Sequence, residues 1–274
     1  MGGYGRPTRP GGADSMGEVT AGYVDIHSHV LYGLDDGART LEDSVAMLEM
    51  AAASGATDMV ATPHANGRYP FNTELVDQRI AELSTRTTVR IHRGCDFHLQ
   101  FDNIEDAVAH PGKYTINRGC YLLVEFPDLA VFNNTEAVLL RLIDAGLVPI
   151  ISHPERHPQL PRMLDDIARW IDLGCYVQVT AASFTGLFGK PARACARELL
   201  ARGLAHFVAS DAHSVTRRTP NLKEAYGLLA NTWGEARIRP LFVENGRAVL
   251  AGEAIEPWDA GGAPTGRKWY RFWR

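Results

Sequence analysis

The chain has 274 residues, of which 45% are hydrophobic, and a formal net charge of −4 at pH 7. This length suits one large α/β domain, and the hydrophobic fraction is sufficient for a sizeable core. The slightly acidic balance argues against a general nucleic-acid binder, and no run of about 18 apolar residues is present that would span a membrane.

Seven short apolar runs recur along the chain, each typical of a buried parallel strand. They cover residues 23–26, 58–62, 89–97, 121–126, 148–152, 176–180 and 206–210. Between the first two runs, a helix is predicted to open at Thr40, with Asp43 in capping-box spacing, and to close near Gly55. Three later helices are expected over 134–145, 161–173 and 191–202, each followed by a glycine. This alternation predicts an α/β fold around a seven-stranded parallel sheet.

Side chains that can bind a metal follow one predicted strand after another. The carboxyl ends of barrel strands meet at one mouth, so these distant residues would converge there. In extended chain, residues i and i+2 face the same side, which groups His27 with His29 and Asp211 with His213. The remaining strand-end candidates are His64, Asp96, Glu125 and His153. Imidazoles and carboxylates together favour Zn, Mn or Fe, and their number predicts two or three ions.

The other polar residues near these positions have less specific interpretations. In the turn LDDGA, one of Asp35 and Asp36 is expected to form the turn and the other to reach a metal. His157 is either a proton donor near the site or a turn cap. The histidines expected to be structural or surface residues are His92, His98, His110 and His206.

Two arginines lie close to predicted ligands along the chain. Arg156 stands three residues after His153, and Arg218 follows the Asp211 and His213 pair. A surface arginine is usually only solvated, but guanidinium groups match phosphate oxygens well. At a mouth with several metals, these two arginines predict a phosphate-ester substrate.

The four cysteines do not indicate a cysteine-dependent phosphatase. That mechanism needs an arginine six residues after the thiolate, and no cysteine here has one. We expect small buried core residues at Cys95, Cys120, Cys175 and Cys195.

The motifs DIHSH, LDDGA, ATPH, GCDFH, LVEF, SHPERH and ASDAHS, in this order, resemble the PHP (polymerase and histidinol phosphatase) superfamily. Within it, DIHSHVLYGLDDGA and HPER are most similar to the CpsB/YwqE-type manganese-dependent tyrosine-protein phosphatases. The resemblance covers residues 23–252 and implies a distorted (β/α)7 barrel with its metal site at the C-terminal mouth of the strands. We expect a phosphatase domain over 22–255, between a disordered segment 1–21 and a tail 256–274.

The resemblance also implies a role for each candidate residue. A first metal would be held by His27, His29, Asp96 and Asp211, a second by Asp96, Glu125 and His153, and a third by Asp36, His64 and His213. Asp96 would bridge two ions, and Arg156 and Arg218 would bind phosphate. Relatives often have Glu at the bridging position, and the shorter Asp96 could shift the metal preference without removing a ligand. The implied ion is Mn²⁺, with Fe or Zn as alternatives.

The implied function is hydrolysis of phosphotyrosine on the tail of a membrane-bound bacterial tyrosine kinase that serves capsule or exopolysaccharide synthesis. One alternative is a PHP phosphoesterase for a small ester such as histidinol phosphate. A PHP nuclease is disfavoured by the negative net charge. A catalytically inactive phosphotyrosine-binding module is disfavoured because unpaired ligands in one mouth are costly without metal.

The two chain ends bear on location. The first twenty residues lack the apolar core of a signal peptide, so we expect a cytoplasmic protein. The last eleven residues, PTGRKWYRFWR, carry four positive charges and four aromatic rings and no acid. Such a tail can bind an anionic membrane surface weakly, which would suit a membrane-bound partner. The alternatives are a solvated tail or one packed on the domain.

Overall fold

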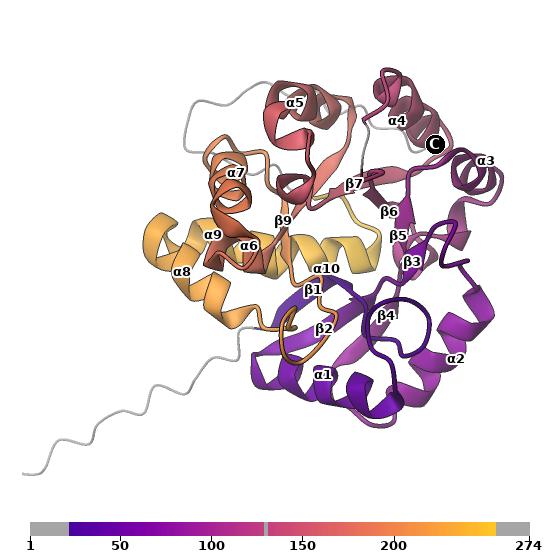
Figure 1. Cartoon of the computed structure of the whole chain (residues 1–274), viewed down its shortest axis with the longest axis vertical. Helices are drawn as coiled ribbons and strands as arrows, with labels where there is room; N and C mark the ends of the chain where they lie inside the picture. The colour runs from indigo at the N-terminus through magenta and orange to yellow at the C-terminus, as the bar shows by residue number, and fades with distance from the viewer. Residues whose placement is uncertain (1–21, 129–130, 256–274) are drawn as a thin grey trace, which may run out of the picture.

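The strands run in parallel and follow the order of the chain. The computed structural model describes residues 22–128 and 131–255 (Figure 1). Within these ranges the strands are β1 (Tyr23–Ser28), β2 (Ala56–Ala61), β3 (His64–Ala65), β4 (Arg90–Arg93), β5 (Asp96–His98), β6 (Tyr121–Glu125), β7 (Val148–Ser152), β8 (Tyr176–Thr180) and β9 (Phe207–Ala209). They form two sheets, β1-β2-β4 and β3-β5-β6-β7-β8-β9.

The two sheets make one continuous wall with seven strand positions. β2 leads into β3 and β4 into β5, and the N–H of Gly94 donates to the carbonyl of Ala61 (2.9 Å) across this break. At the other end, a parallel bridge joins Ser28 to Ala212, just after β9. The molecule is therefore the distorted (β/α)7 barrel that the resemblance implied.

The single strand predicted over 89–97 is wrong in detail, because the chain breaks at Gly94 between β4 and β5. A Cβ at Gly94 would lie 2.6 Å from Cγ1 of Val60 and 3.0 Å from Cγ2 of Thr62. The side chains of Val60 and Thr62 lie so close to the chain at this kink that only glycine fits without a shift.

Helices surround the strands (Figure 1). They are α1 (Leu41–Ala53), α2 (Thr73–Leu83), α3 (Phe101–Ala109), α4 (Thr135–Asp144), α5 (Leu164–Leu173), α6 (Ala181–Thr185), α7 (Gly189–Ala201), α8 (Lys223–Trp233), α9 (Glu235–Phe242) and α10 (Glu244–Ala251). The four predicted helices appear as α1, α4, α5 and α7, and the predicted capping box of Thr40 and Asp43 opens α1. None of the helices described here is long and apolar enough to cross a bilayer.

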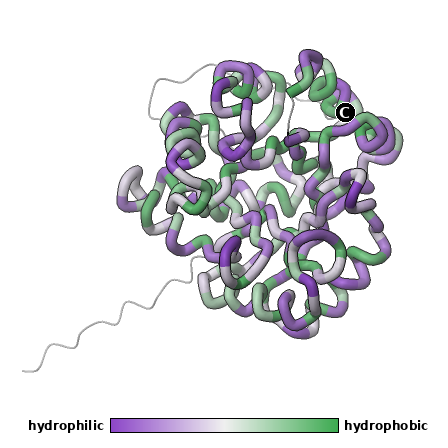
Figure 2. The backbone as a smooth tube through the Cα atoms, in the orientation of Figure 1, coloured by the Kyte–Doolittle hydropathy of each residue, from purple (hydrophilic) through white to green (hydrophobic). Residues whose placement is uncertain are grey.

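The hydrophobic core consists of two clusters of buried residues. Hydrophobic residues gather at the centre of the molecule (Figure 2). The larger cluster contains residues of strands and helices together, while the smaller one joins residues of β1, β2 and β6–β9 to Val249 of α10. Among the cysteines, Cys95, Cys175 and Cys195 are buried as predicted, but Cys120 is only half-buried. Segments 1–21 and 256–274 lie outside the described residues, so the predicted domain boundaries stay a prediction.

Candidate metal centre

The end of β1 brings two histidines together. Nε2 of His27 and Nε2 of His29 lie 3.3 Å apart, and both side chains are buried. Oδ1 of Asp211 lies 3.3 Å from the first of these nitrogens and 3.4 Å from the second. The predicted same-side arrangement of the two histidines is therefore what the structure has, and Asp211 joins them from the segment after β9.

Asp96 occupies the middle of the group. Its Oδ2 lies 3.2 Å from Nδ1 of His64 and 3.5 Å from Nε2 of His27. Glu125, at the end of β6, is within 3.4 Å of His64 through Oε2 and within 3.6 Å of Nε2 of His153 through Oε1. Asp96 thus contacts ligand candidates from two different segments, β1 and β3. It also belongs to two of the groups whose ligand atoms all lie within 4.8 Å of one another, as a bridging residue would.

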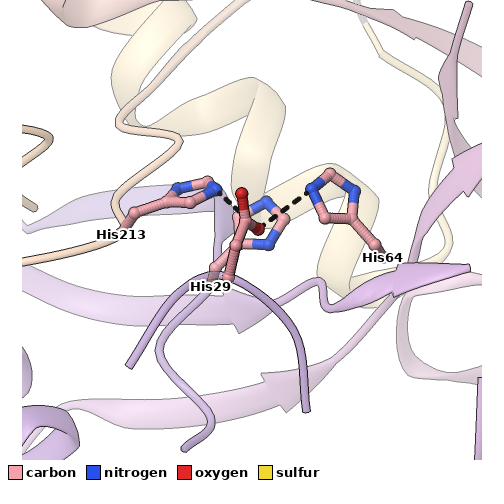
Figure 3. A group of neighbouring side chains, drawn as sticks. His29, His64 and His213 are labelled. Atoms are coloured by element: carbon pink, nitrogen blue, oxygen red, sulfur yellow. Dashed lines mark ion pairs between the residues drawn. The ribbon is translucent and has the colours of Figure 1, made fainter. Parts of the chain in front are cut away.

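A third group forms around Asp36. Its Oδ1 lies 3.4 Å from Nε2 of His64 and 3.4 Å from Nε2 of His213. In Figure 3, His64 and His213 approach from opposite sides with His29 between them. All nine predicted metal ligands therefore lie together, although their individual roles stay a prediction.

The donor set fits divalent metal ions. Two ligand atoms that are each about 2.1 Å from one ion are separated by roughly 3.0–3.4 Å, close to the distances found here. Within the described ranges, both carboxylate oxygens of Asp96, Oδ1 of Asp211 and Nε2 of His213 are buried without a hydrogen-bond partner. Leaving buried polar atoms unpaired costs free energy, so these unpaired atoms indicate that a bound ligand completes the site.

Two of the candidate ligands have a left-handed backbone. The φ angle is 31° at His153 and 50° at Asp211, and neither residue is a glycine. This conformation costs free energy in an L-residue and is concentrated at functional sites. It adds to the case that these two positions are held for function.

The protonation states differ among the histidines. Burial lowers the pKa of His153 to about 3 and that of His213 to about 4, so both rings are neutral and can offer a lone pair. Burial alone would also lower the pKa of His29, but the charge of Asp35, its hydrogen bond to the ring and the nearby carboxylate of Asp211 raise it to about 9. A metal ion must therefore compete with a proton for His29.

Asp35 does more than form the turn. Its Oδ1 accepts the N–H of Gly37 (2.9 Å), which is the turn contact that the sequence predicts. Its Oδ2 also pairs with Nδ1 of His29 (2.6 Å) and accepts the N–H of His64 (3.1 Å). Asp35 therefore orients one proposed ligand ring while Asp36 reaches the other group.

Two further residues at the site were not predicted. Gln178, in the middle of β8, pairs through Oε1 with Nδ1 of His27 (3.0 Å). His98, expected to be structural or on the surface, has Nδ1 3.6 Å from Oε2 of Glu125. A polar residue inside the apolar run YVQVT was the signal that could have indicated Gln178.

His157 caps a turn. Its Nδ1 accepts the N–H groups of Gln159 (3.1 Å) and Leu160 (3.2 Å), and its Nε2 donates to the carbonyl of Pro127 (2.9 Å). Of the two interpretations left open, the structure therefore favours the turn cap, because both ring nitrogens are engaged.

The two predicted arginines meet at Asp211, within the group of candidate ligands. Arg156 and Arg218 both donate to Oδ2 of Asp211. Their side chains keep 20% and 23% of their surface exposed. A pocket of about 110 Å³ lies beside Arg156, with Glu125 and His153 in its wall. Two cationic groups thus remain partly exposed to solvent next to the candidate metal ligands.

The chain is similar to known proteins over most of its length. Residues 23–251 match the family model described as "Capsular polysaccharide synthesis, CpsB/CapC". The tyrosine-protein phosphatase CpsB of Streptococcus pneumoniae is 30% identical over 246 residues, which covers 85% of this chain and 100% of that protein. The tyrosine-protein phosphatase YwqE of Bacillus subtilis (strain 168) is 30% identical over 238 residues, covering 85% of this chain and 93% of that protein.

Solved structures show the same fold. A structure described under YwqE from Bacillus subtilis and CpsB from Streptococcus pneumoniae, "unique metal-dependent tyrosine phosphatases", superposes with a TM-score of 0.77. Its sequence identity is 29%, and it covers 85% of this chain and 96% of its own. The histidinol phosphate phosphatase of Lactococcus lactis has a TM-score of 0.51, 12% identity, and coverage of 77% and 94%. This second likeness concerns the fold alone.

Proposed function

Because the chain belongs to the CpsB/CapC family, we propose that it is a metal-dependent phosphatase that hydrolyses phosphotyrosine in a protein substrate. The observation that carries this proposal is the convergence of nine imidazole and carboxylate ligands beside two arginines at one mouth. Its relatives CpsB and YwqE are named tyrosine-protein phosphatases, which supports the choice of phosphotyrosine.

The metal positions that we propose are those that the family resemblance implies. The first would be held by His27, His29, Asp96 and Asp211, the second by Asp96, Glu125 and His153, and the third by Asp36, His64 and His213. We propose Mn²⁺ as the ion, with Fe or Zn as alternatives, because mixed N and O ligands suit these metals. Bound divalent ions supply polarisation of the phosphoryl group and lower the pKa of water.

The chain's own residues handle the charge of the substrate. Arg156 and Arg218 would exchange their contact with Asp211 for the phosphoryl oxygens, whose charge is redistributed in the transition state. A tyrosine leaving group has a pKa of about 10, so its departure depends less on a proton donor than that of an alkyl alcohol. This matches a mouth in which His157 is held by backbone contacts on both ring nitrogens.

The substrate we propose is the tyrosine-phosphorylated tail of a membrane-bound bacterial kinase in capsule or exopolysaccharide synthesis. The family description supports the capsule assignment. The enzyme would then act in the cytoplasm, at the inner face of the membrane. We expect no nucleic-acid partner, given the net charge of −4.

The test pairs metal analysis with activity on two substrates. We expect hydrolysis of a tyrosine-phosphorylated peptide with Mn²⁺, loss of this activity with a chelator, and little turnover of histidinol phosphate. Turnover of histidinol phosphate alone would favour the small-ester alternative. Bound metal with neither activity, but with retained peptide binding, would favour the inactive binding module.

A further inference from the structure

Gln178 lies beneath the metal centre in the middle of β8. Its side chain is fully buried, and its backbone pairs with Ser152 of β7, next to His153. Oε1 of Gln178 lies 3.0 Å from Nδ1 of His27 and accepts the backbone N–H of His153 at 3.3 Å. One amide oxygen thus connects the ends of β1 and β7, which carry two of the proposed ligands.

These two contacts determine which ring nitrogen of His27 carries the hydrogen. A backbone N–H can only donate, so the Gln178 atom that faces His153 must be the oxygen. The same oxygen faces Nδ1 of His27, so that ring nitrogen must carry the hydrogen. In a neutral ring, the lone pair then lies on Nε2. Nε2 is the nitrogen that faces Asp96 (3.5 Å) and Asp211 (3.3 Å).

Gln178 also contacts the backbone of His153, through the N–H group of that residue. Its φ of 31° is a conformation that an L-residue adopts only when its surroundings enforce it. The ring of His153 stacks on that of His27, with the centroids 5.4 Å apart. His27, Asp96 and His153 form one of the groups whose ligand atoms lie within 4.8 Å of one another. Gln178 therefore contacts two of the three members of this group.

We infer that Gln178 is a positioning residue of the metal centre, which holds His27 in its Nδ1–H tautomer and fixes the backbone of His153. Asp35 does the corresponding task for His29, but with a carboxylate. The mouth already contains the carboxylates of Asp36, Asp96, Glu125 and Asp211. A neutral amide supplies an acceptor without adding another negative charge. This inference rests on the proposed metal centre.

The experiment compares the substitution Gln178→Leu with Asn245→Leu in the full-length protein. Asn245 is also a buried amide, but it donates to the backbone carbonyl of His206 (2.7 Å) and contacts none of the proposed ligands. Each metal-stripped protein is titrated with Mn²⁺ by calorimetry, its bound ions are counted by elemental analysis, and its melting temperature is measured.

We expect Gln178→Leu to raise the dissociation constant for Mn²⁺ by about 10- to 100-fold, the usual effect of losing a group that orients a ligand. Asn245→Leu should lower the melting temperature but leave Mn²⁺ affinity unchanged. Gln178→Glu keeps the accepting oxygen and should restore affinity to within a few-fold of wild type. If Gln178→Leu does not fold, Gln178→Asn withdraws the oxygen by one methylene and should still weaken binding.

Unchanged Mn²⁺ affinity in both Gln178→Leu and Gln178→Asn would overturn the inference. An equal loss of affinity in Asn245→Leu would do the same, because the effect would then reflect stability alone. Wild-type protein that binds no Mn²⁺ would remove the metal centre and this role together. Wild-type protein that binds Mn²⁺ but does not hydrolyse phosphotyrosine would refute the proposed activity and leave the inference standing.

Discussion

Arg156 and Arg218 both contact Oδ2 of Asp211. The other carboxylate oxygen of this residue, Oδ1, faces His27 and His29. Burial would raise the pKa of Asp211, but the charges of His27 and Arg156 outweigh it and lower that pKa well below its usual range. Asp211 is therefore ionised and connects the proposed metal ligands to the two arginines that we propose bind phosphate.

We predict that Arg156→Ala and Arg218→Ala each lower kcat/KM for a phosphotyrosyl peptide by about 10²- to 10³-fold. Each variant loses a donor that stabilises charge in the transition state. Elemental analysis should show the same metal content as wild type, because neither arginine is a ligand. Arg202→Ala serves as a control, since Arg202 pairs with Asp165 and not with any proposed ligand. Loss of metal from the two test variants would mean that these arginines are structural.

At the scale of elements, α10 packs closely against β1 through Gly246. A Cβ at this position would lie 2.7 Å from both Cβ and Cγ1 of Val24. Gly227, in α8, has no atom within 4 Å of the corresponding point. The two glycines thus differ in tertiary packing although both lie inside helices.

We predict opposite effects of alanine at these two positions. Gly227→Ala should stabilise the protein by about 0.5–1 kcal/mol, because alanine is the better helix former. Gly246→Ala should be destabilising by about 1–3 kcal/mol, because the added methyl group displaces Val24 or the helix. Denaturant unfolding of both variants measures the difference. Equal stabilisation by both would show that α10 is free to move away from β1.

A second contact between elements joins β2 to β4. Asp58 accepts from Nε (2.7 Å) and Nη2 (2.6 Å) of Arg90 and lies 2.8 Å from Nε2 of His92. Burial would raise the pKa of Asp58, but the hydrogen bonds from Arg90, His92 and Thr57 lower it below its usual value. The ionised carboxylate therefore stabilises the folded state.

We predict that Asp58→Asn lowers the free energy of unfolding at pH 7 by about 1 kcal/mol, a modest value because Arg90 is largely exposed. The pKa of Asp58 in the folded state lies below its unfolded value of about 3.9. The extra stability of the wild-type protein over the variant is therefore fully present above that pH. It is lost as the pH falls through the folded pKa. The urea midpoints of the wild-type protein and the Asp58→Asn variant, measured from pH 7 down to pH 2, should converge as the pH falls. A constant difference over the whole range would argue against this role of the charge.

For the molecule as a whole, the barrel brings candidate metal ligands from most of its wall positions to one mouth. The basic aromatic tail lies outside the described residues. We predict that the tail adds weak affinity for anionic membranes, because it combines positive charges with aromatic rings. Co-sedimentation with anionic liposomes, with and without residues 264–274, measures this. Neutral liposomes are the control, and equal binding of the two proteins to anionic liposomes would refute the prediction.

Much of the candidate site could be predicted because its residues follow strands at regular places. His27, His29, Asp211 and His213 were grouped by the alternation of extended chain and by the rule that strand ends share one mouth. The assignment of ligands to separate ions came from the resemblance, and the distances in the structure are compatible with it. The broken strand at Gly94 was missed, because the close approach of Val60 depends on a neighbouring strand.

The sequence alone determined the alternation of strands and helices, the types of candidate ligand and the order in which these residues follow the strands. These features depend on propensity and periodicity, which act over a few residues. Only the tertiary structure decided which ligands are neighbours, that Asp35 orients His29, and that Gln178 holds His27 across 151 positions of sequence. Such contacts arise when the barrel wall forms, because its geometry sets the distance between residues that are far apart in the chain.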